Sequence, residues 1–206
     1  MIPAGLTMIL AMTAIVALVR GLLGVASTPP IAAMSAELRR RLAAGEVVVT
    51  DQLPPGASKT AQGGTAVALL RASPDEVWSV IADYPGHTRY YPRVSEAEVV
   101  EADERRVVVR YRVSVGPVSF GFYMDKYPDA ARRRVDWQLA DGRPHGLFRE
   151  NSGYWQVDAT DAPDTSLVTY AIAVRTMLPG FVTDGAERGS LVDTITALRK
   201  LVESPR

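Results

Sequence analysis

The hydrophobic and polar positions of the chain follow three patterns in turn. Residues 8–19 form an uncharged apolar run near the N-terminus. From Glu46 onward, apolar residues recur mostly at every second position, which is the period of a half-buried β-strand. Two stretches, one after Ser73 and one after Pro179, instead show the 3.6-residue spacing of a helix. The pattern therefore predicts an apolar leader followed by a domain that mixes strands with helices.

The alternating segments are separated by turn residues, as the strands of an antiparallel sheet are. A short first strand is expected at Glu46–Thr50. Seven further strands are expected at Thr65–Arg71, Val94–Glu101, Arg105–Val115, Val118–Tyr127, Arg132–Ala140, Asn151–Ala159 and Thr165–Arg175. We therefore predict a curved antiparallel sheet of about seven strands.

Two short helices carry clear start and stop signals. Ser35 is placed to cap a helix that ends at Gly45. Ser73 is placed to cap a second helix that begins with Pro74. The Arg39–Arg41 run on the first helix is either a solvated face or a contact for anionic lipid headgroups.

A long C-terminal helix is expected from Pro179 to about Glu203. Its inward stripe is predicted to be Val182, Gly185 or Ala186, Gly189, Val192, Ile195, Leu198 and Val202. The first half of this stripe is small, so either the sheet approaches the helix closely there or the helix borders a cavity. The order of the elements predicts an α+β fold in which the sheet wraps on this helix.

The apolar leader admits three interpretations. Residues 1–26 hold one charged side chain, Arg20, and Gly24–Ala26 offers small residues for cleavage, but the basic n-region of a signal peptide is missing. A cleaved secretory signal, a retained membrane anchor, and a soluble protein with a misplaced start or a buried helix all stay open. The first two place the folded part outside the cytosol, on the periplasmic side in a bacterium, or at a membrane. We expect three regions: 1–26 as signal peptide or anchor, 27–64 as linker, short helix and extra strand, and 65–206 as the main domain.

Composition excludes several kinds of function. The 23 basic and 23 acidic side chains balance, which argues against binding to the phosphates of nucleic acid. The absence of cysteine excludes disulfides, thiol nucleophiles and Cys-ligated metals. With only His87 and His145, a histidine-rich metal centre is also not expected. We therefore predict no metal and no cofactor.

Three motifs, in this order, resemble those of a known superfamily. They are Ser73–Trp78 continuing through Val80–Tyr84 to Tyr91–Val94, then Gly153–Val157, then Leu178–Phe181. Together they resemble the START-like (SRPBCC, helix-grip) superfamily over about residues 65–202, and most of all its polyketide cyclase/dehydrase and coenzyme Q-binding branch. The resemblance implies a helix-grip fold, with a deep cavity between sheet and C-terminal helix that takes hydrophobic small molecules or lipids. Such proteins include carriers, lipid-transfer modules, cyclases and sensors, and the fold alone does not choose among them.

The inward faces of the predicted strands supply most candidate ligand-binding residues: Tyr111, Phe120, Phe122, Met124, Trp137, Trp155 and Tyr170. Each is either plain core or cavity wall, and those with a polar tip suit a cavity best because they can orient a ligand. The end of the last strand and the terminal helix add Arg175, Phe181, Gly185, Gly189 and Val192. We expect the mouth of the cavity at Tyr90–Pro92 and in the loop 176–181.

No motif for a nucleophile, a phosphate loop or a dinucleotide site occurs, and both histidines are expected in exposed loops, so no catalytic residue is predicted. The function expected is non-catalytic binding or transport of a lipid, isoprenoid quinone or polyketide-like molecule, next to a membrane surface and without nucleic acid. The alternative is a cyclase or dehydratase acting on polyketide-type substrates. A weaker third option is a protein-interaction module with a collapsed cavity.

Overall fold

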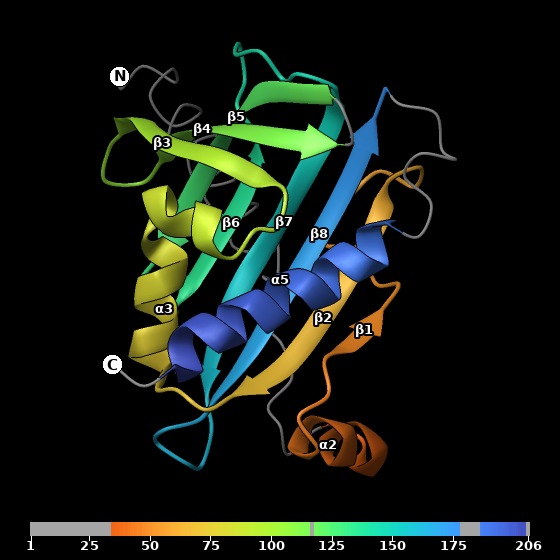
Figure 1. Ribbon diagram of the computed structural model, residues 1–206, viewed down its shortest axis with the longest axis vertical. Helices are drawn as coiled ribbons and strands as arrows, with labels where there is room; N and C mark the ends of the chain where they lie inside the picture. Colours follow the sequence, from red (N-terminus) through yellow and green to blue (C-terminus); the bar gives the residue numbers. More distant parts are fainter. Residues whose placement is uncertain (1–33, 116–117, 178–185, 205–206) are drawn as a thin grey trace, which may run out of the picture.

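The computed structural model describes residues 34–115, 118–177 and 186–204 (Figure 1). The apolar leader, the expected helix start at Pro179, and the candidates Phe181 and Gly185 lie outside these residues. Among the described helices, none combines the length and the apolar character needed to cross a membrane.

The described strands form one antiparallel sheet of eight strands in the order β1-β2-β8-β7-β6-β5-β4-β3. The strands are β1 (Val48–Thr50), β2 (Gln62–Leu70), β3 (Val94–Ala102), β4 (Val107–Val115), β5 (Val118–Asp129), β6 (Arg134–Leu139), β7 (Phe148–Ala159) and β8 (Ser166–Thr176). Seven of them correspond to the predicted sheet. The eighth is the short first strand, which joins the same sheet because Val48–Thr50 pairs with Thr65–Val67 of β2.

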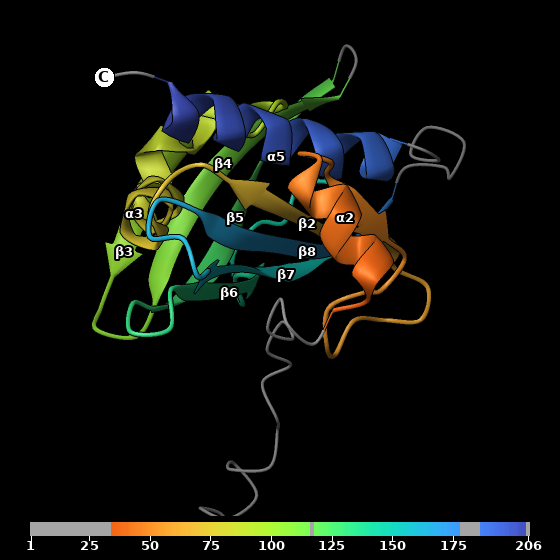
Figure 2. The same ribbon diagram turned by 90° about the horizontal axis from the view of Figure 1, so that it is seen from below.

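The helices cover the two faces of this sheet unequally. They are α2 (Ala36–Ala43), α3 (Pro74–Ala82), the 3₁₀ helix η2 (Tyr84–Arg89) and α5 (Ala186–Glu203). Figure 1 shows α5 running obliquely across one face, and Figure 2 shows the sheet curving beneath it. This arrangement is the α+β, helix-grip architecture that the sequence predicted.

Alternation along β2 explains how both faces are packed. Ala66, Ala68 and Leu70 join the main core with α3 and α5, whereas Val67 and Leu69 contact a smaller cluster with α2. Successive side chains of a strand point to opposite faces, so one strand serves both layers. The main core therefore lies between the sheet and α5, on the face where the cavity described below opens.

The start of α3 follows from its local sequence. The Ser73 hydroxyl accepts a hydrogen bond from the backbone N–H of Glu76, and the Glu76 carboxylate accepts one from the backbone N–H of Ser73. This reciprocal capping box satisfies two N–H groups that the first helical turn otherwise leaves without partners. Pro74 occupies the first turn, where its missing N–H costs nothing.

The inward stripe of α5 agrees with the prediction at Ile195 and Leu198 and departs from it earlier in the helix. Leu191, Ile195 and Leu198 are buried, whereas Val192 is 37% exposed and Gly189 is also exposed. The expected stripe was therefore wrong over Gly189 and Val192. The physical reason is the helical phase: residues 191, 195 and 198 have the i, i+4, i+7 spacing of one face, and Val192 lies about 100° round the helix from Leu191.

A candidate ligand-binding cavity

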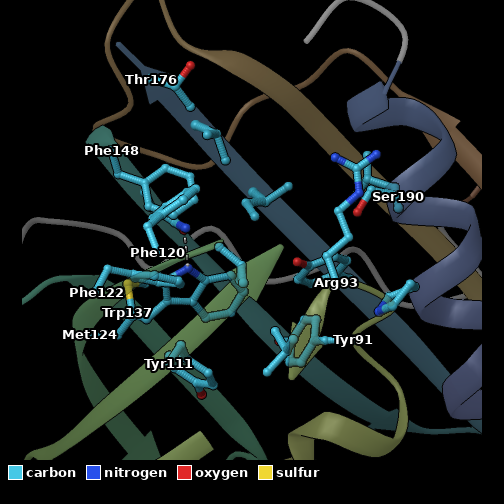
Figure 3. Close-up of a pocket in the computed structure, with 18 of the residues that line it drawn as sticks. Tyr91, Arg93, Tyr111, Phe120, Phe122, Met124, Trp137, Phe148, Thr176 and Ser190 are labelled. Carbon is cyan, nitrogen blue, oxygen red and sulfur yellow. Dashed lines mark hydrogen bonds between the residues drawn. The ribbon is translucent and has the colours of Figure 1, made fainter. Parts of the chain in front are cut away.

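A cavity of about 200 Å³ lies between the sheet and α5. Its walls come from strands β4 to β8, from residues 91–94 before and at the start of β3, and from α5. Figure 3 shows aromatic side chains gathered along one side of it and Ser190 of α5 across from them. The lining is mostly apolar, as is usual for sites that take small organic molecules.

Six of the residues proposed from the sequence line this cavity: Tyr111, Phe120, Phe122, Met124, Trp137 and Tyr170. They come from four different strands, and their convergence follows from the alternation, which puts every second side chain on the concave face. Phe148 of β7 also lines the cavity but was not among the candidates. Its ring packs edge-to-face on Phe122 at a centroid distance of 4.8 Å. Its strand was predicted to begin only at Asn151.

Four other candidates do not line the cavity. Trp155 is fully buried in the core, where its ring stacks on Tyr170 at 4.1 Å between centroids. Arg175 is exposed and faces Glu150, 3.8 Å away. Gly189 and Val192 lie on the exposed side of α5, as described above.

Some of the residues expected at the mouth of the cavity belong to its lining. Tyr91, Pro92 and Thr176 line the cavity, but Tyr90 is buried in the core. The Tyr91 hydroxyl accepts a hydrogen bond of 2.7 Å from Nε1 of Trp155. This bond ties Tyr91, a lining residue, to Trp155 in the core beneath the cavity lining.

Lys126 is a cavity residue that the sequence analysis missed. Only 4% of it is exposed, and its Nζ lies 4.4 Å from the centroid of the Trp137 ring and 5.4 Å from that of Tyr111. Burial lowers the pKa of this amine from 10.5 to about 7, because an apolar setting disfavours the charged form. The signal that could have found it is the alternation of β5, which continues from Phe122 and Met124 to Lys126.

Asn151 places a second polar group in the wall. Its Oδ1 accepts a hydrogen bond of 3.3 Å from Nε1 of Trp137. The indole N–H can only donate, so this contact fixes the amide with its oxygen toward Trp137 and its NH₂ group directed elsewhere.

The surroundings of His87 differ from the prediction. It was predicted in an exposed loop, but it is 1% exposed in η2, packed against β4. Its Nε2 donates to the carbonyl oxygen of Ile81 at 2.9 Å, and its Nδ1 accepts from the Tyr111 hydroxyl at 2.7 Å. The backbone carbonyl has no proton to give, so it selects the Nε2–H tautomer.

The electrostatic state of this pair is neutral. Burial lowers the pKa of His87 to about 3, with a contribution from the charge of Lys126. Burial also raises the pKa of Tyr111 well above its usual value of 10. Both groups therefore keep their neutral forms near pH 7, and their hydrogen bond joins η2 to the sheet. The other histidine, His145, is half-buried in a turn, where Nε2 donates to the Ala140 carbonyl at 2.8 Å.

The fold is similar to several solved structures. The Zhui aromatase/cyclase from Streptomyces sp. R1128 is 19% identical with a TM-score of 0.59, over 68% of this chain and 92% of that one. A START superfamily protein from Mycobacterium smegmatis is 17% identical with a TM-score of 0.57, over 68% and 95%. A STAR-related lipid transfer protein from Xanthomonas axonopodis is 14% identical with a TM-score of 0.57, over 77% and 99%. At these identities the likeness shows the fold alone.

The sequence itself identifies the family. Residues 70–199 match the family described as "Polyketide cyclase / dehydrase and lipid transport". No curated protein matches the chain. The matched region runs from the end of β2 into α5 and therefore contains every strand that lines the cavity. Because this match spans more than half of the sequence and the fold agrees with it, the chain belongs to the polyketide cyclase/dehydrase and lipid transport family and has a START-like, helix-grip fold.

Proposed function

We propose that the protein binds a hydrophobic small molecule in the cavity between the sheet and α5 and releases it chemically unchanged. Lipids, isoprenoid quinones and polyketide-like compounds are the classes that fit an apolar wall of this kind. The observation that carries the proposal is the cavity itself, about 200 Å³ of space walled mainly by aromatic and aliphatic side chains. Protein interiors are normally close-packed, so an apolar space kept open in the centre of a fold favours an apolar occupant over a collapsed interaction module.

The engagement of His87 and Tyr111 supports binding without catalysis. A general acid or base must reach the substrate, either directly or through one water molecule. Here the Tyr111 hydroxyl donates to His87, and the second nitrogen of His87 is held by the Ile81 carbonyl. The pair is therefore occupied in holding η2 on the sheet. We keep cyclase or dehydratase activity on polyketide-type substrates as the alternative outcome of the test below.

Native mass spectrometry of gently purified protein, followed by organic extraction, tests the proposal. We expect a non-covalent adduct whose extracted compound is apolar and unmodified, and whose return to the stripped protein raises the melting temperature, because a ligand that binds only the folded state stabilises it. Catalytic turnover of an added polyketide-type substrate would instead favour the cyclase or dehydratase alternative. Protein that carries no adduct and shows no melting shift with any apolar ligand would overturn both.

We also propose, from the apolar residues 8–19, that the protein acts at a membrane or outside the cytosol. N-terminal sequencing after cell fractionation tests this. A new N-terminus near residue 27 in the soluble exported fraction indicates a cleaved signal, and an intact chain in the membrane fraction indicates an anchor. An intact chain in the cytosol would contradict the proposal.

A further inference from the structure

The charged residues that line the cavity all have the same sign. Among the described lining residues these are Arg93, which is exposed, and Lys126, which is buried. No aspartate or glutamate occurs in this part of the lining. An apolar molecule that entered the cavity would therefore meet positive charge that no acidic residue of the described lining balances.

Lys126 has no counter-ion within the described part of the chain. Its Nζ makes no hydrogen bond or ion pair there, and its close neighbours are the faces of Trp137 and Tyr111. The adjacent acid, Asp125, lies on the opposite side of β5, where Arg106 approaches its carboxylate to 3.7 Å. Aromatic faces attract an ammonium group, but they replace only part of the hydration that burial removes. A buried ammonium group in this setting still lacks a hydrogen-bond acceptor or a counter-ion.

Asn151 supplies a donor next to the same ring. Trp137 separates the two groups, with Lys126 over its face and Asn151 at its Nε1. The Asn151 Oδ1 atom accepts the hydrogen bond of the Trp137 indole. The NH₂ group of Asn151 has no hydrogen-bond partner among the described residues. Lys126, Trp137 and Asn151 come from β5, β6 and β7, three adjacent strands. Lys126 and Asn151 thus add an amine donor and an amide donor to a wall that is mostly apolar.

We infer that the ligand of this cavity is an apolar molecule with one anionic oxygen group, such as a carboxylate or an ionised phenol or enol, which binds Lys126 Nζ and the Asn151 amide. The inference rests on the proposed function, because it names the chemistry of the ligand in that same cavity. The anion supplies the missing counter-ion, and the apolar body of the ligand packs on the aromatic wall formed by Phe120, Phe122 and Phe148. A charge-assisted hydrogen bond of this kind is stronger than one between neutral groups.

Pairs of probes that differ only in charge test this inference. Decanoate is compared with decanamide, and 2-naphthoate with 2-naphthamide, by calorimetric titration of the purified protein at pH 7. We expect each carboxylate to bind at least tenfold more tightly than its amide. The preference should vanish in Lys126→Met, and it should weaken in Asn151→Asp, which keeps the acceptor for Trp137 but gives Lys126 an internal counter-ion. Arg175→Met is the matched control, because it removes an exposed cation outside the cavity, and it should keep the wild-type preference.

The outcomes separate the two ideas. Equal binding of acid and amide by the wild-type protein, or a preference that survives in Lys126→Met, would overturn the inference while the proposed function stands. If the protein binds none of the four probes and no compound extracted from it, the proposed function and the inference are both overturned. Loss of the preference in Arg175→Met as well would show that overall charge, and not the cavity amine, governs binding, and this too would overturn the inference.

Discussion

The Tyr111 hydroxyl lies 2.7 Å from Nδ1 of His87, inside the protein and next to the cavity wall. The ring of Tyr111 thus faces the ligand space, while its hydroxyl fastens a helical turn that is 24 residues away in sequence. One side chain therefore contributes both to the site and to the packing that holds the site in shape.

Removing the Tyr111 hydroxyl should destabilise the protein. In Tyr111→Phe, the Nδ1 atom of His87 stays buried but loses its donor, which costs about 1–3 kcal/mol of the free energy of unfolding. Urea denaturation measures this loss. Tyr127→Phe is the control, because its hydroxyl lies on a partly exposed side chain at 3.4 Å from Asp125. Equal stability of the two variants would contradict the role given to the His87 hydrogen bond.

Acid should weaken the fold through His87. Its pKa is about 3 when folded and about 6.5 when unfolded, so between these values the unfolded chain binds more protons than the native one. The contribution of His87 to stability is therefore complete above pH 6.5 and falls as the pH drops toward 3, with a slope of up to about 1.4 kcal/mol per pH unit. Urea unfolding at steps from pH 7 to 5, above most carboxylate titrations, measures this slope. His87→Gln should flatten it, and an unchanged slope in that variant would refute the assignment.

Replacing Lys126 should stabilise the protein at neutral pH. The pKa of Lys126 is about 7 when folded and about 10.5 when unfolded, so wild-type stability rises with pH between these values. Lys126→Met removes the amine, and we expect a gain of roughly 1–3 kcal/mol at pH 7 that shrinks as the pH approaches 10.5. The groups that face Lys126 are Tyr111, Trp137 and the neutral His87. These groups are the same in both proteins, so their effects on stability cancel when the two melting temperatures are compared. A Lys126→Met variant less stable than the wild type at pH 7 would contradict the prediction.

Gly153 of β7 is required where it lies between its neighbours on β6 and β8. A Cβ atom there would lie 2.1 Å from the Ala171 carbonyl oxygen and 2.6 Å from Cζ2 of Trp137. Gly153→Ala should therefore cost several kcal/mol, about 3 or more, through overpacking against backbone that cannot move away. Gly121→Ala is a matched strand control, because its Cβ would meet the Tyr111 carbonyl oxygen at an ordinary 3.6 Å. Thermal melting should separate the two clearly, and similar melting temperatures would argue against the close approach.

Filling the cavity from α5 should block the ligand. Ser190 lines the cavity and Val192, two residues later, is exposed outside it. A neutral apolar probe such as decanamide at 100 times its Kd stabilises the wild-type protein by about 2.7 kcal/mol. Ser190→Trp should lose most of this stabilisation, whereas Val192→Trp should keep it, as measured by the probe-dependent shift in melting temperature. Equal shifts in the two variants would place the ligand elsewhere.

Local signals account for the part of the fold that the sequence predicted. The capping box at Ser73 and Glu76 and the alternation along β4 and β5 act within a few residues, so they can be recognised without knowing the tertiary structure. Six wall residues of the cavity followed directly from that alternation. Val192 was misplaced because Gly185 and Gly189, which precede it in the predicted stripe, carry no hydrophobic side chain that would fix the helical phase.

Lys126 and His87 depend on contacts that are distant in sequence. Alternation puts Lys126 on the inward face, but its burial depends on Trp137 and Tyr111, which arrive from two other strands. His87 follows Pro85 and Gly86, which are typical of an exposed turn, but it is buried where it bonds Tyr111 of β4 and the Ile81 carbonyl of α3. Tertiary packing, not local preference, decides the surroundings of both residues.

The strand order separates pairings that are local in sequence from one that is distant. From β3 to β8 each strand pairs with the next one along the chain, so these six strands can assemble as successive local hairpins. The exception is β2, whose Val67 pairs with Thr169 of β8, about one hundred residues later, a separation of the kind that slows folding. During synthesis, β2 must wait for the last strand to leave the ribosome before this edge closes. The cavity wall formed by β4 to β8 can therefore assemble from local strand pairs without β2, and only α5, which follows β8 in the chain, is then needed to complete the lining that these strands share with residues 91–94.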